Sequence, residues 1–393
     1  MPSTESLTSY ISSLELKDLP LVIQDASRIE NVHTQVEVIE QCLRNILLKM
    51  DPQTPRDPRP EQVRTLRRLI FGKGDTLLIA RTGFGKSLIF HAYSILTRKI
   101  TLQIIPLSKL GDEQFRDIRE LGSTNPCLLT SESKRRELAL IKRIQSGEFT
   151  HILLGPEQAL SKVFRDALKD PELQARIGLV AIDECHLVKQ WKDFRAHFSM
   201  LGELRSILRQ QVVWFGCSAT LDTETEHLVL QNAGFRQVGS RMFQTEVIRT
   251  SINREDISIC VYPIPRGQIT TFETLYFLLD NSVDTYQNTI TPDRIPKTIV
   301  FVDSHTKVAA IAAFFRTALL SKSTTFTHPY STSNKEGSSV FDIINTFTSR
   351  VSQYDRDIRY TKFKDPSSSI RIMVATTSLG MGVNVPDVTR VVN

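Results

Sequence analysis

Short apolar segments alternate with longer amphipathic stretches along most of this chain. Uniformly apolar, β-prone runs predict strands at Thr76–Ala80, Thr101–Ile105, His151–Leu154, Leu179–Ile182, Val212–Phe215, Thr298–Val302, Ile370–Ala375 and Val388–Val392. Strands that are apolar along their whole length are typical of a parallel sheet that helices cover on both faces. The pattern therefore predicts two α/β domains in series.

An amphipathic segment precedes the first of these domains. Between Asn31 and Met50, apolar residues recur at helical spacing, at Val32, Val36, Ile39, Leu43 and Ile46. They predict a helix whose apolar face either packs on the next domain or binds a partner. The prolines within residues 51–60 exclude regular structure there and indicate a linker.

The same pattern divides the chain. Residues 1–50 are expected to form a helical N-terminal extension, 51–245 the first domain and 246–393 the second. Gly239–Asp256 lacks a strong pattern and is interpreted as the hinge between the domains. Ser321–Ser339 is rich in serine and threonine, which indicates a loop or an insertion in the second domain.

The composition is that of a globular protein without a membrane span. Of 393 residues, 40% are hydrophobic and 23% are charged. No apolar run is long enough to cross a bilayer, and Met1–Leu16 lacks the basic start and apolar core of a signal peptide. The net charge of +6 permits a polyanionic partner without requiring one. The cysteines show no metal-ligand spacing and are expected to be reduced and buried: Cys42, Cys127, Cys185, Cys217 and Cys260.

A glycine-rich loop follows the first predicted strand and leads into a predicted helix. Gly83 and Gly85 allow the backbone to turn its N–H groups toward phosphates, and Lys86 supplies a positive charge to the β and γ phosphates of a nucleotide. The hydroxyl of Ser87 can bind Mg²⁺, and the helix N-terminus adds its dipole. A strict phosphate-binding loop has glycine where Ala80 stands. The nucleotide-binding residues predicted in this loop are Thr82, Gly83, Gly85, Lys86 and Ser87.

A second site with carboxylates lies at the end of the predicted strand Leu179–Ile182. Asp183 and Glu184 follow this strand directly. Phosphoryl transfer needs Mg²⁺ near the β and γ phosphates and a group that orients the attacking water. Asp183 fits the metal role and Glu184 the water role, because the end of a parallel strand places them at the edge where ligands of such sheets bind.

These residues resemble the motifs of superfamily 2 helicases. Asp-Glu-Cys-His at 183–186 is similar to their D-E-x-H box, and Cys217–Thr220 to the S-A-T motif, in which Ser218 and Thr220 link the nucleotide state to nucleic acid. Arg59 and Gln62 lie in a segment similar to the motif that reads adenine, for which an amide provides both a donor and an acceptor. Two further segments resemble strand-end motifs that contact the nucleic-acid backbone: Pro106–Leu107 with Gln114, and Gly155–Glu157.

The stretch after the D-E-x-H box is similar to the aromatic-rich loop of RecQ helicases, which in that family senses DNA. Aromatic faces stack bases, and an arginine pairs with phosphate. The alternative is that these aromatic residues belong to the core. The loop differs from the family by the loss of one residue after Trp191, where a histidine is usual. The residues that carry the resemblance are Trp191, Phe194, Arg195 and Phe198.

The resemblance continues into the second predicted domain. Asn253–Ile257, Lys297–Ser304 and Val374–Val388 are similar to family motifs that occur in this order. The resemblance implies two RecA-like domains in tandem, ATP and Mg²⁺ as cofactors, and single-stranded or forked DNA as partner. It further implies 3′-to-5′ unwinding in DNA repair or recombination, and location in the nucleus.

The family's arginine-bearing helix follows the last of these motifs, whereas the given sequence ends at Asn393. The resemblance therefore implies that the second domain is incomplete here. A binding module that holds ATP and nucleic acid without turnover is one alternative, since an arginine finger contributes ~10³–10⁵ in rate. An RNA helicase is another, against which the Asp-Glu-Cys-His box and the aromatic loop argue.

Overall fold

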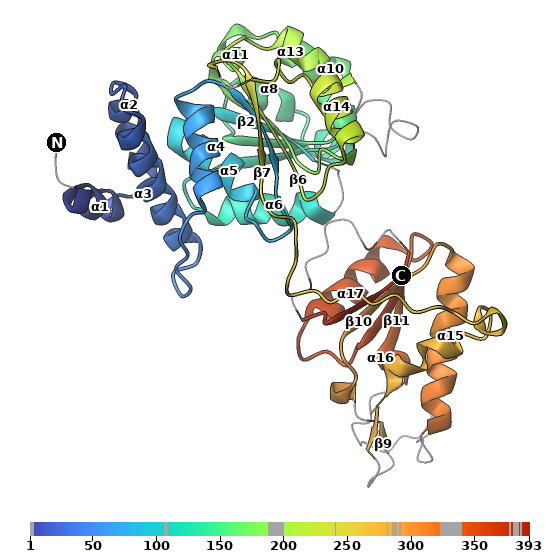
Figure 1. Cartoon of the computed structure of the whole chain (residues 1–393). Helices are drawn as coiled ribbons and strands as arrows, with labels where there is room; N and C mark the ends of the chain where they lie inside the picture. The colour runs from blue at the N-terminus through green and yellow to red at the C-terminus, as the bar shows by residue number, and fades with distance from the viewer. Residues whose placement is uncertain are drawn as a thin grey trace. The chain divides into compact units, whose positions relative to one another are not determined.

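The computed structural model describes residues 4–105, 109–187, 200–239, 241–280, 282–284, 289–290, 292–322, 340–376, 379, 385 and 387–393. They form two compact units, Met1–Ile257 and Ser258–Asn393, each with its own sheet (Figure 1). No helix among these described residues is long and apolar enough to cross a membrane.

The first unit is built on a seven-stranded sheet with the order β3-β4-β2-β5-β6-β1-β7, in which every pair of neighbours is parallel. Its interior strands are buried along their whole length, which confirms the parallel sheet that the apolar runs predict. The strands are β1 (Asp75–Ile79), β2 (Ile100–Ile104), β3 (Pro126–Leu129), β4 (His151–Leu154), β5 (Ile177–Ile182), β6 (Val213–Ser218) and β7 (Thr245–Arg249).

Helices cover both faces of this sheet. Successive side chains of a strand point to opposite faces, so Leu179 and Ala181 of β5 join one apolar cluster, while Val180 and Ile182 join another. The helices are α4 (Pro60–Ile70), α5 (Ser87–Thr97), α6 (Lys109–Glu120), α7 (Ser131–Arg136), α8 (Leu140–Gln145), α9 (Pro156–Ala159), α10 (Lys162–Ala167), α11 (Pro171–Arg176), α13 (Glu203–Ile207) and α14 (Thr223–Asn232).

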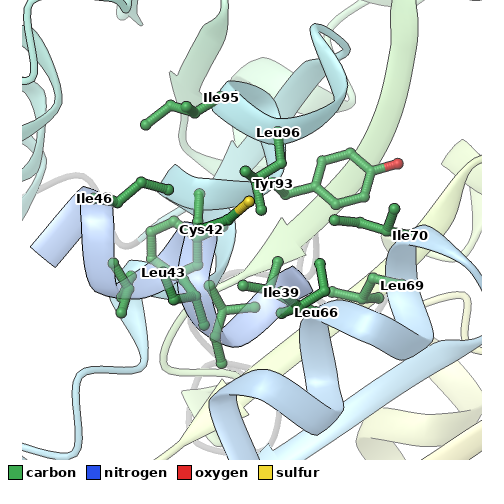
Figure 2. Close-up of a cluster of buried hydrophobic side chains, with 14 of the residues drawn as sticks. Ile39, Cys42, Leu43, Ile46, Leu66, Leu69, Ile70, Tyr93, Ile95 and Leu96 are labelled. Carbon is green, nitrogen blue, oxygen red and sulfur yellow. The ribbon is translucent and has the colours of Figure 1, made fainter. Parts of the chain in front are cut away.

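The N-terminal extension is part of the first unit. It consists of α1 (Thr4–Ser13), a 3-10 turn η1 (Leu16–Asp18), α2 (Leu19–Ser27) and α3 (Val32–Met50). The side chain of Asn31 caps α3 by accepting from the N–H groups of His33 and Thr34. Figure 2 shows the apolar face of α3 against α4 and α5. Of the two predicted alternatives, packing on the domain or binding a partner, the structure therefore shows packing on the domain. The labelled residues in this contact are Ile39, Cys42, Leu43, Ile46, Leu66, Leu69, Ile70, Tyr93, Ile95 and Leu96.

The second unit repeats the architecture on a smaller scale. Its parallel sheet has the order β11-β12-β10-β13, with a helix-rich layer on each face. The strands are β10 (Thr298–Phe301), β11 (Ile344–Phe347), β12 (Ile372–Ala375) and β13 (Arg390–Val392). The helices are α15 (His305–Lys322), α16 (Val340–Ile343) and α17 (Gln353–Lys364), with short 3-10 turns η3 (Arg266–Gln268), η4 (Glu273–Leu279) and η5 (Pro292–Arg294) and a hairpin of β8 (Val283–Asp284) and β9 (Thr289–Ile290).

The structure differs from the sequence prediction at five of the described strands and one boundary. The apolar runs did not predict β3, β7, β8, β9 or β11, which are short and, apart from β3, contain polar residues. Strand β7 lies inside the segment interpreted as a hinge, and it pairs along its whole length with β1. The first unit therefore continues past residue 245 to Ile257. Most of the predicted insertion, from residue 323 to 339, lies outside the described residues.

The cysteines follow the prediction with one exception. Cys42, Cys127, Cys185 and Cys217 are free thiols in buried positions, whereas Cys260 is exposed. It lies on an irregular segment at the start of the second unit that makes no strand, so no sheet covers it. Burial raises the pKa of the Cys42 thiol to about 12, which keeps it protonated and unreactive.

Candidate nucleotide-binding site

The predicted phosphate loop joins the carboxyl end of β1 to the first turn of α5. Gly83 (φ 78°) and Gly85 (φ 82°) both lie in the left-handed region that favours glycine. A Cβ on Gly85 would lie 2.7 Å from Nε2 of Gln62, so this position also lacks room for a side chain. Thr82, Gly83 and Gly85 are exposed to solvent. The loop therefore presents its backbone to an incoming ligand.

Lys86 folds back over this loop. Its Nζ donates to the backbone oxygens of Ala80 (2.9 Å) and Arg81 (3.3 Å). The positive charge also reaches the carboxylate site, because it contributes to lowering the pKa of Glu184. Ser87 is the first residue of α5, where the helix dipole favours negative charge.

Gln62 ties α4 to the phosphate loop. Its Oε1 accepts from the N–H of Arg59 (2.8 Å), and its Nε2 donates to the backbone oxygens of Phe84 (3.1 Å) and Gly85 (2.9 Å). The amide that the family resemblance assigns to adenine is thus engaged with the backbone in this structure. The guanidinium of Arg59 lies over the ring of Phe84, 4.7 Å from its centre.

A cleft of about 770 Å³ opens beside the phosphate loop. One wall is formed by Arg59, Arg81 and Phe84, and the other by the segment Thr250–Asp256, which continues from β7. Asp256 accepts two hydrogen bonds from Arg254, and it lies 3.9 Å from the guanidinium of Arg81. From the sequence alone, the residues of this second wall are interpreted mainly as part of the hinge between the domains.

Asp183 is buried at the carboxyl end of β5. Its Oδ1 accepts from the N–H of Glu184 (2.9 Å) and the thiol of Cys217 (3.2 Å), and its Oδ2 accepts from the amide of Gln114 (2.8 Å). Burial raises the pKa of Asp183 above its usual range, and the charge of Glu184 adds to this, while the three hydrogen bonds oppose it.

Glu184 occupies a sharp turn directly after β5. Its φ of 49° lies in the left-handed region, which is uncommon for a residue with a side chain. Oε2 lies 3.3 Å from Nδ1 of His186. Burial favours a higher pKa for Glu184, but the hydrogen bond and charge of His186, together with Lys86, outweigh it, so the pKa is lowered. The Glu184 side chain is therefore held as a carboxylate.

Besides the bond from the Cys217 thiol to Asp183, two further hydrogen bonds connect the Asp-Glu-Cys-His segment to the Cys-Ser-Ala-Thr segment at the end of β6. The N–H of Cys185 donates to the oxygen of Cys217 (3.0 Å), and Nδ1 of His186 lies 2.9 Å from Oγ of Ser218. The Ser218 hydroxyl donates to the backbone oxygen of Thr220 (2.9 Å), so it accepts from His186. Nδ1 of His186 consequently carries the proton.

Some residues of the predicted site are placed differently or lie outside the described residues. Gln114, which the resemblance assigns to a nucleic-acid motif, is buried and bonded to Asp183. Of the other motif, Pro156 is buried at the start of α9. The structure does not describe residues 106–108, 380–384 or the aromatic loop with Trp191, Phe194, Arg195 and Phe198. Sequence reasoning named Gln114 but missed its hydrogen bond to Asp183, since only the fold shows what a helix position faces.

Comparisons with known proteins agree with this geometry. A DEAD/DEAH box helicase model matches residues 59–228, and a helicase conserved C-terminal domain model matches residues 281–393. A putative ATP-dependent DNA helicase Q1 of Caenorhabditis briggsae is 26% identical over 331 residues, which cover 82% of this chain and 46% of that protein. The RecQ helicase of Synechocystis is 27% identical over 42% of this chain and 35% of its own length. The chain belongs to the RecQ-like helicases of superfamily 2.

This RecQ-like chain spans only part of its relatives. The exonuclease and helicase WRN of Mus musculus is 32% identical over 38% of the chain, which corresponds to 10% of WRN. The Caenorhabditis briggsae and Synechocystis proteins are also covered over less than half of their lengths.

Solved structures of helicases share the fold. MrfA bound to DNA superposes with a TM-score of 0.59 and 16% identity, covering 87% of this RecQ-like chain and 45% of MrfA. Lhr of Mycobacterium smegmatis bound to single-stranded DNA and AMP-PNP gives 0.55 and 19%, with 89% and 43% covered. These likenesses, together with the two parallel sheets, confirm the predicted architecture of two RecA-like domains that follow a helical N-terminal segment in the chain.

Proposed function

We propose that this chain is the ATP-driven motor of a DNA helicase. The observation that supports it is a pair of hydrogen bonds at the edge of the sheet, from Cys217 to Asp183 and from His186 to Ser218. The charge of Lys86 reaches the same edge, where it helps to lower the pKa of Glu184. These hydrogen bonds connect the proposed nucleotide site with the segment after β6, which can respond to nucleotide binding. Conversion of ATP hydrolysis into movement on nucleic acid requires such coupling between two sites.

The phosphate loop would hold the triphosphate. Backbone N–H groups around Thr82, Gly83 and Gly85 bind phosphate oxygens, and Lys86 exchanges its backbone partners for the β and γ phosphates. Arg59 stacks on the base in the adjoining cleft. Gln62 holds the loop and offers its amide to adenine when the loop moves.

The hydroxyl of Ser87 and the carboxylate of Asp183 are oxygen donors, the type that Mg²⁺ takes in phosphoryl-transfer sites. They would hold Mg²⁺, which when bound neutralises charge on the phosphates. Glu184, kept ionised by His186 and Lys86, orients the attacking water and accepts its proton.

The substrate follows from the relatives, which are named DNA helicases. We propose single-stranded or forked DNA, 3′-to-5′ movement, a role in repair or recombination, and a nuclear location. Trp191, Phe194, Arg195 and Phe198 would stack bases and pair with phosphate, and Ser218 with Thr220 would transmit the nucleotide state.

The test is ATP hydrolysis by the purified chain, with and without single-stranded DNA, beside Lys86→Ala. We expect DNA-stimulated turnover in the wild type, and loss of ATP binding with the fold retained in the variant. Unchanged nucleotide affinity in Lys86→Ala would overturn the phosphate-loop assignment. Salt-matched affinities for DNA and RNA strands of one sequence decide the substrate, since a reader of the 2′-hydroxyl prefers RNA.

A further inference from the structure

A buried polar chain runs from β2 through α6 to the carboxylate of Asp183. Gln103 of β2 is fully buried, and its amide nitrogen donates to Oε1 of Gln114. Gln114 of α6 is 5% exposed, and its Nε2 donates to Oδ2 of Asp183 at 2.8 Å. Two buried glutamines thus form a hydrogen-bonded chain that ends on one carboxylate.

The orientation of the Gln114 amide follows from its partners. An ionised carboxylate only accepts hydrogen bonds, so the NH₂ group of Gln114 must face Asp183. Its oxygen then faces Gln103, whose NH₂ group supplies the required donor. Each glutamine therefore fixes the next, and the rotation of Asp183 is fixed in turn.

The hydrogen bonds on Asp183 are distributed unequally between its oxygens. Among the described residues, Oδ1 accepts from Glu184 and Cys217, whereas Oδ2 accepts from Gln114. A carboxylate offers about four lone-pair sites, about two on each oxygen. Oδ2 is accordingly the oxygen with room for one more partner, and Gln114 is the group that shares it.

We infer that Gln114 is a positioning residue that presents Oδ2 of Asp183 to the divalent cation of a bound nucleotide. This inference rests on the proposed function, in which Asp183 serves the cation. Residues that hydrogen-bond to a metal-binding carboxylate fix its orientation, and their replacement weakens metal affinity by ~10–100-fold. Gln114 has this relation to Asp183, although it lies 69 positions away in sequence.

A glutamine that only fills space in the core would behave differently. Its loss would lower the stability of the first unit and weaken all ligands together. A positioning residue would lower cation affinity while leaving cation-free nucleotide binding unchanged. The two roles therefore separate in a measurement that does not depend on turnover.

The experiment compares Mn²⁺ binding to the ADP-loaded wild type and to Gln114→Met, by electron paramagnetic resonance of free Mn²⁺. Methionine has a similar length but no amide donor. We expect about tenfold weaker Mn²⁺ binding in the variant. The affinity for a fluorescent ADP analogue in EDTA should be unchanged. Gln174→Met, which removes a glutamine bonded to the backbone oxygen of Ile207, is the matched control and should bind Mn²⁺ like the wild type.

Equal Mn²⁺ affinities of wild type and Gln114→Met would overturn the inference. It would also be overturned if the variant bound the ADP analogue in EDTA more weakly and melted at a lower temperature, since the glutamine would then have a general structural role. Absence of any ADP-dependent Mn²⁺ site in the wild type overturns the proposed function instead. If Gln114→Met does not fold, Gln103→Met takes its place, since it removes only the group that orients Gln114. Mn²⁺ affinity equal to wild type in that variant also overturns the inference.

Discussion

Nδ1 of His186 donates a hydrogen bond to the hydroxyl of Ser218, 2.9 Å away, and so joins the ends of β5 and β6. The same N–H lies 3.3 Å from the carboxylate of Glu184. A change at the carboxylate can therefore reach β6 through a single imidazole. The geometry offers a physical route between hydrolysis and the segment assigned to nucleic acid.

Ser218→Ala removes the acceptor of this bond without removing a group proposed to touch the nucleotide. We expect basal ATP hydrolysis to persist, while stimulation by single-stranded DNA falls about tenfold, the equivalent of one hydrogen bond of ~1.4 kcal/mol. Steady-state turnover against DNA concentration measures this. Ser206→Ala, which removes an exposed hydroxyl bonded to the oxygen of Glu203, should behave as wild type. Retained stimulation in Ser218→Ala would contradict the route through His186.

Glu184→Gln keeps the shape of the side chain but removes its charge and basicity. We expect ATP binding to persist and hydrolysis to fall by ~10²–10⁴-fold, because proton transfer from the attacking water loses its acceptor. Phosphate release and nucleotide titration measure the two effects separately, with the exposed residue Glu172 changed to glutamine as control. Persistent hydrolysis would show that another group orients the water.

Leu43→Ala tests the contact between the extension and the first domain. Leu43 is fully buried in the cluster of Figure 2. A cavity there should lower the free energy of unfolding of the first unit by ~2–5 kcal/mol. Urea unfolding measures this, with the change of exposed Leu21 to alanine as control. A loss as small as in the control would mean that α3 detaches in solution and that its apolar face is free for a partner.

Stability should fall as the pH drops from about 6.5 toward 4. Burial lowers the pKa of His91 to about 3 and that of His151 to about 4. Their unfolded pKa is about 6.5, so between these values the unfolded chain binds protons that the folded chain does not. Each histidine then removes ~1.4 kcal/mol of stability per pH unit.

Urea unfolding between pH 7 and 5 checks this sign. His91→Met should show a shallower loss of stability on acidification than the wild type, because one buried titrating group is gone. The change of His33, whose side chain is 84% exposed, to glutamine should leave the pH dependence unaltered. Equal slopes for wild type and His91→Met would mean that the buried imidazole does not govern acid stability.

Much of the fold could be predicted from pattern alone. The predicted strands coincide with β1, β2, β4, β5, β6, β10, β12 and β13 to within three residues at each end, because interior strands of a parallel sheet are largely apolar. Strand β7 was missed because Thr245–Arg249 contains only two apolar residues, Val247 and Ile248, and its formation depends on pairing with β1. Its Glu246 bonds to Arg64 of α4, far away in sequence.

The residues of the candidate site could be predicted from the sequence, whereas the contacts between them could not. The glycines, lysine and serine of the phosphate loop are identifiable from the sequence, because their chemistry depends on consecutive residues between a strand and a helix. The same holds for Asp183 and Glu184 at the end of a strand. The partners of these residues depend on distant segments: Gln114 on Asp183, Gln62 on the loop, and Ser218 on His186. Only the tertiary structure decides them, because hydrogen bonds between separate elements follow from packing and leave no periodic signal in the chain.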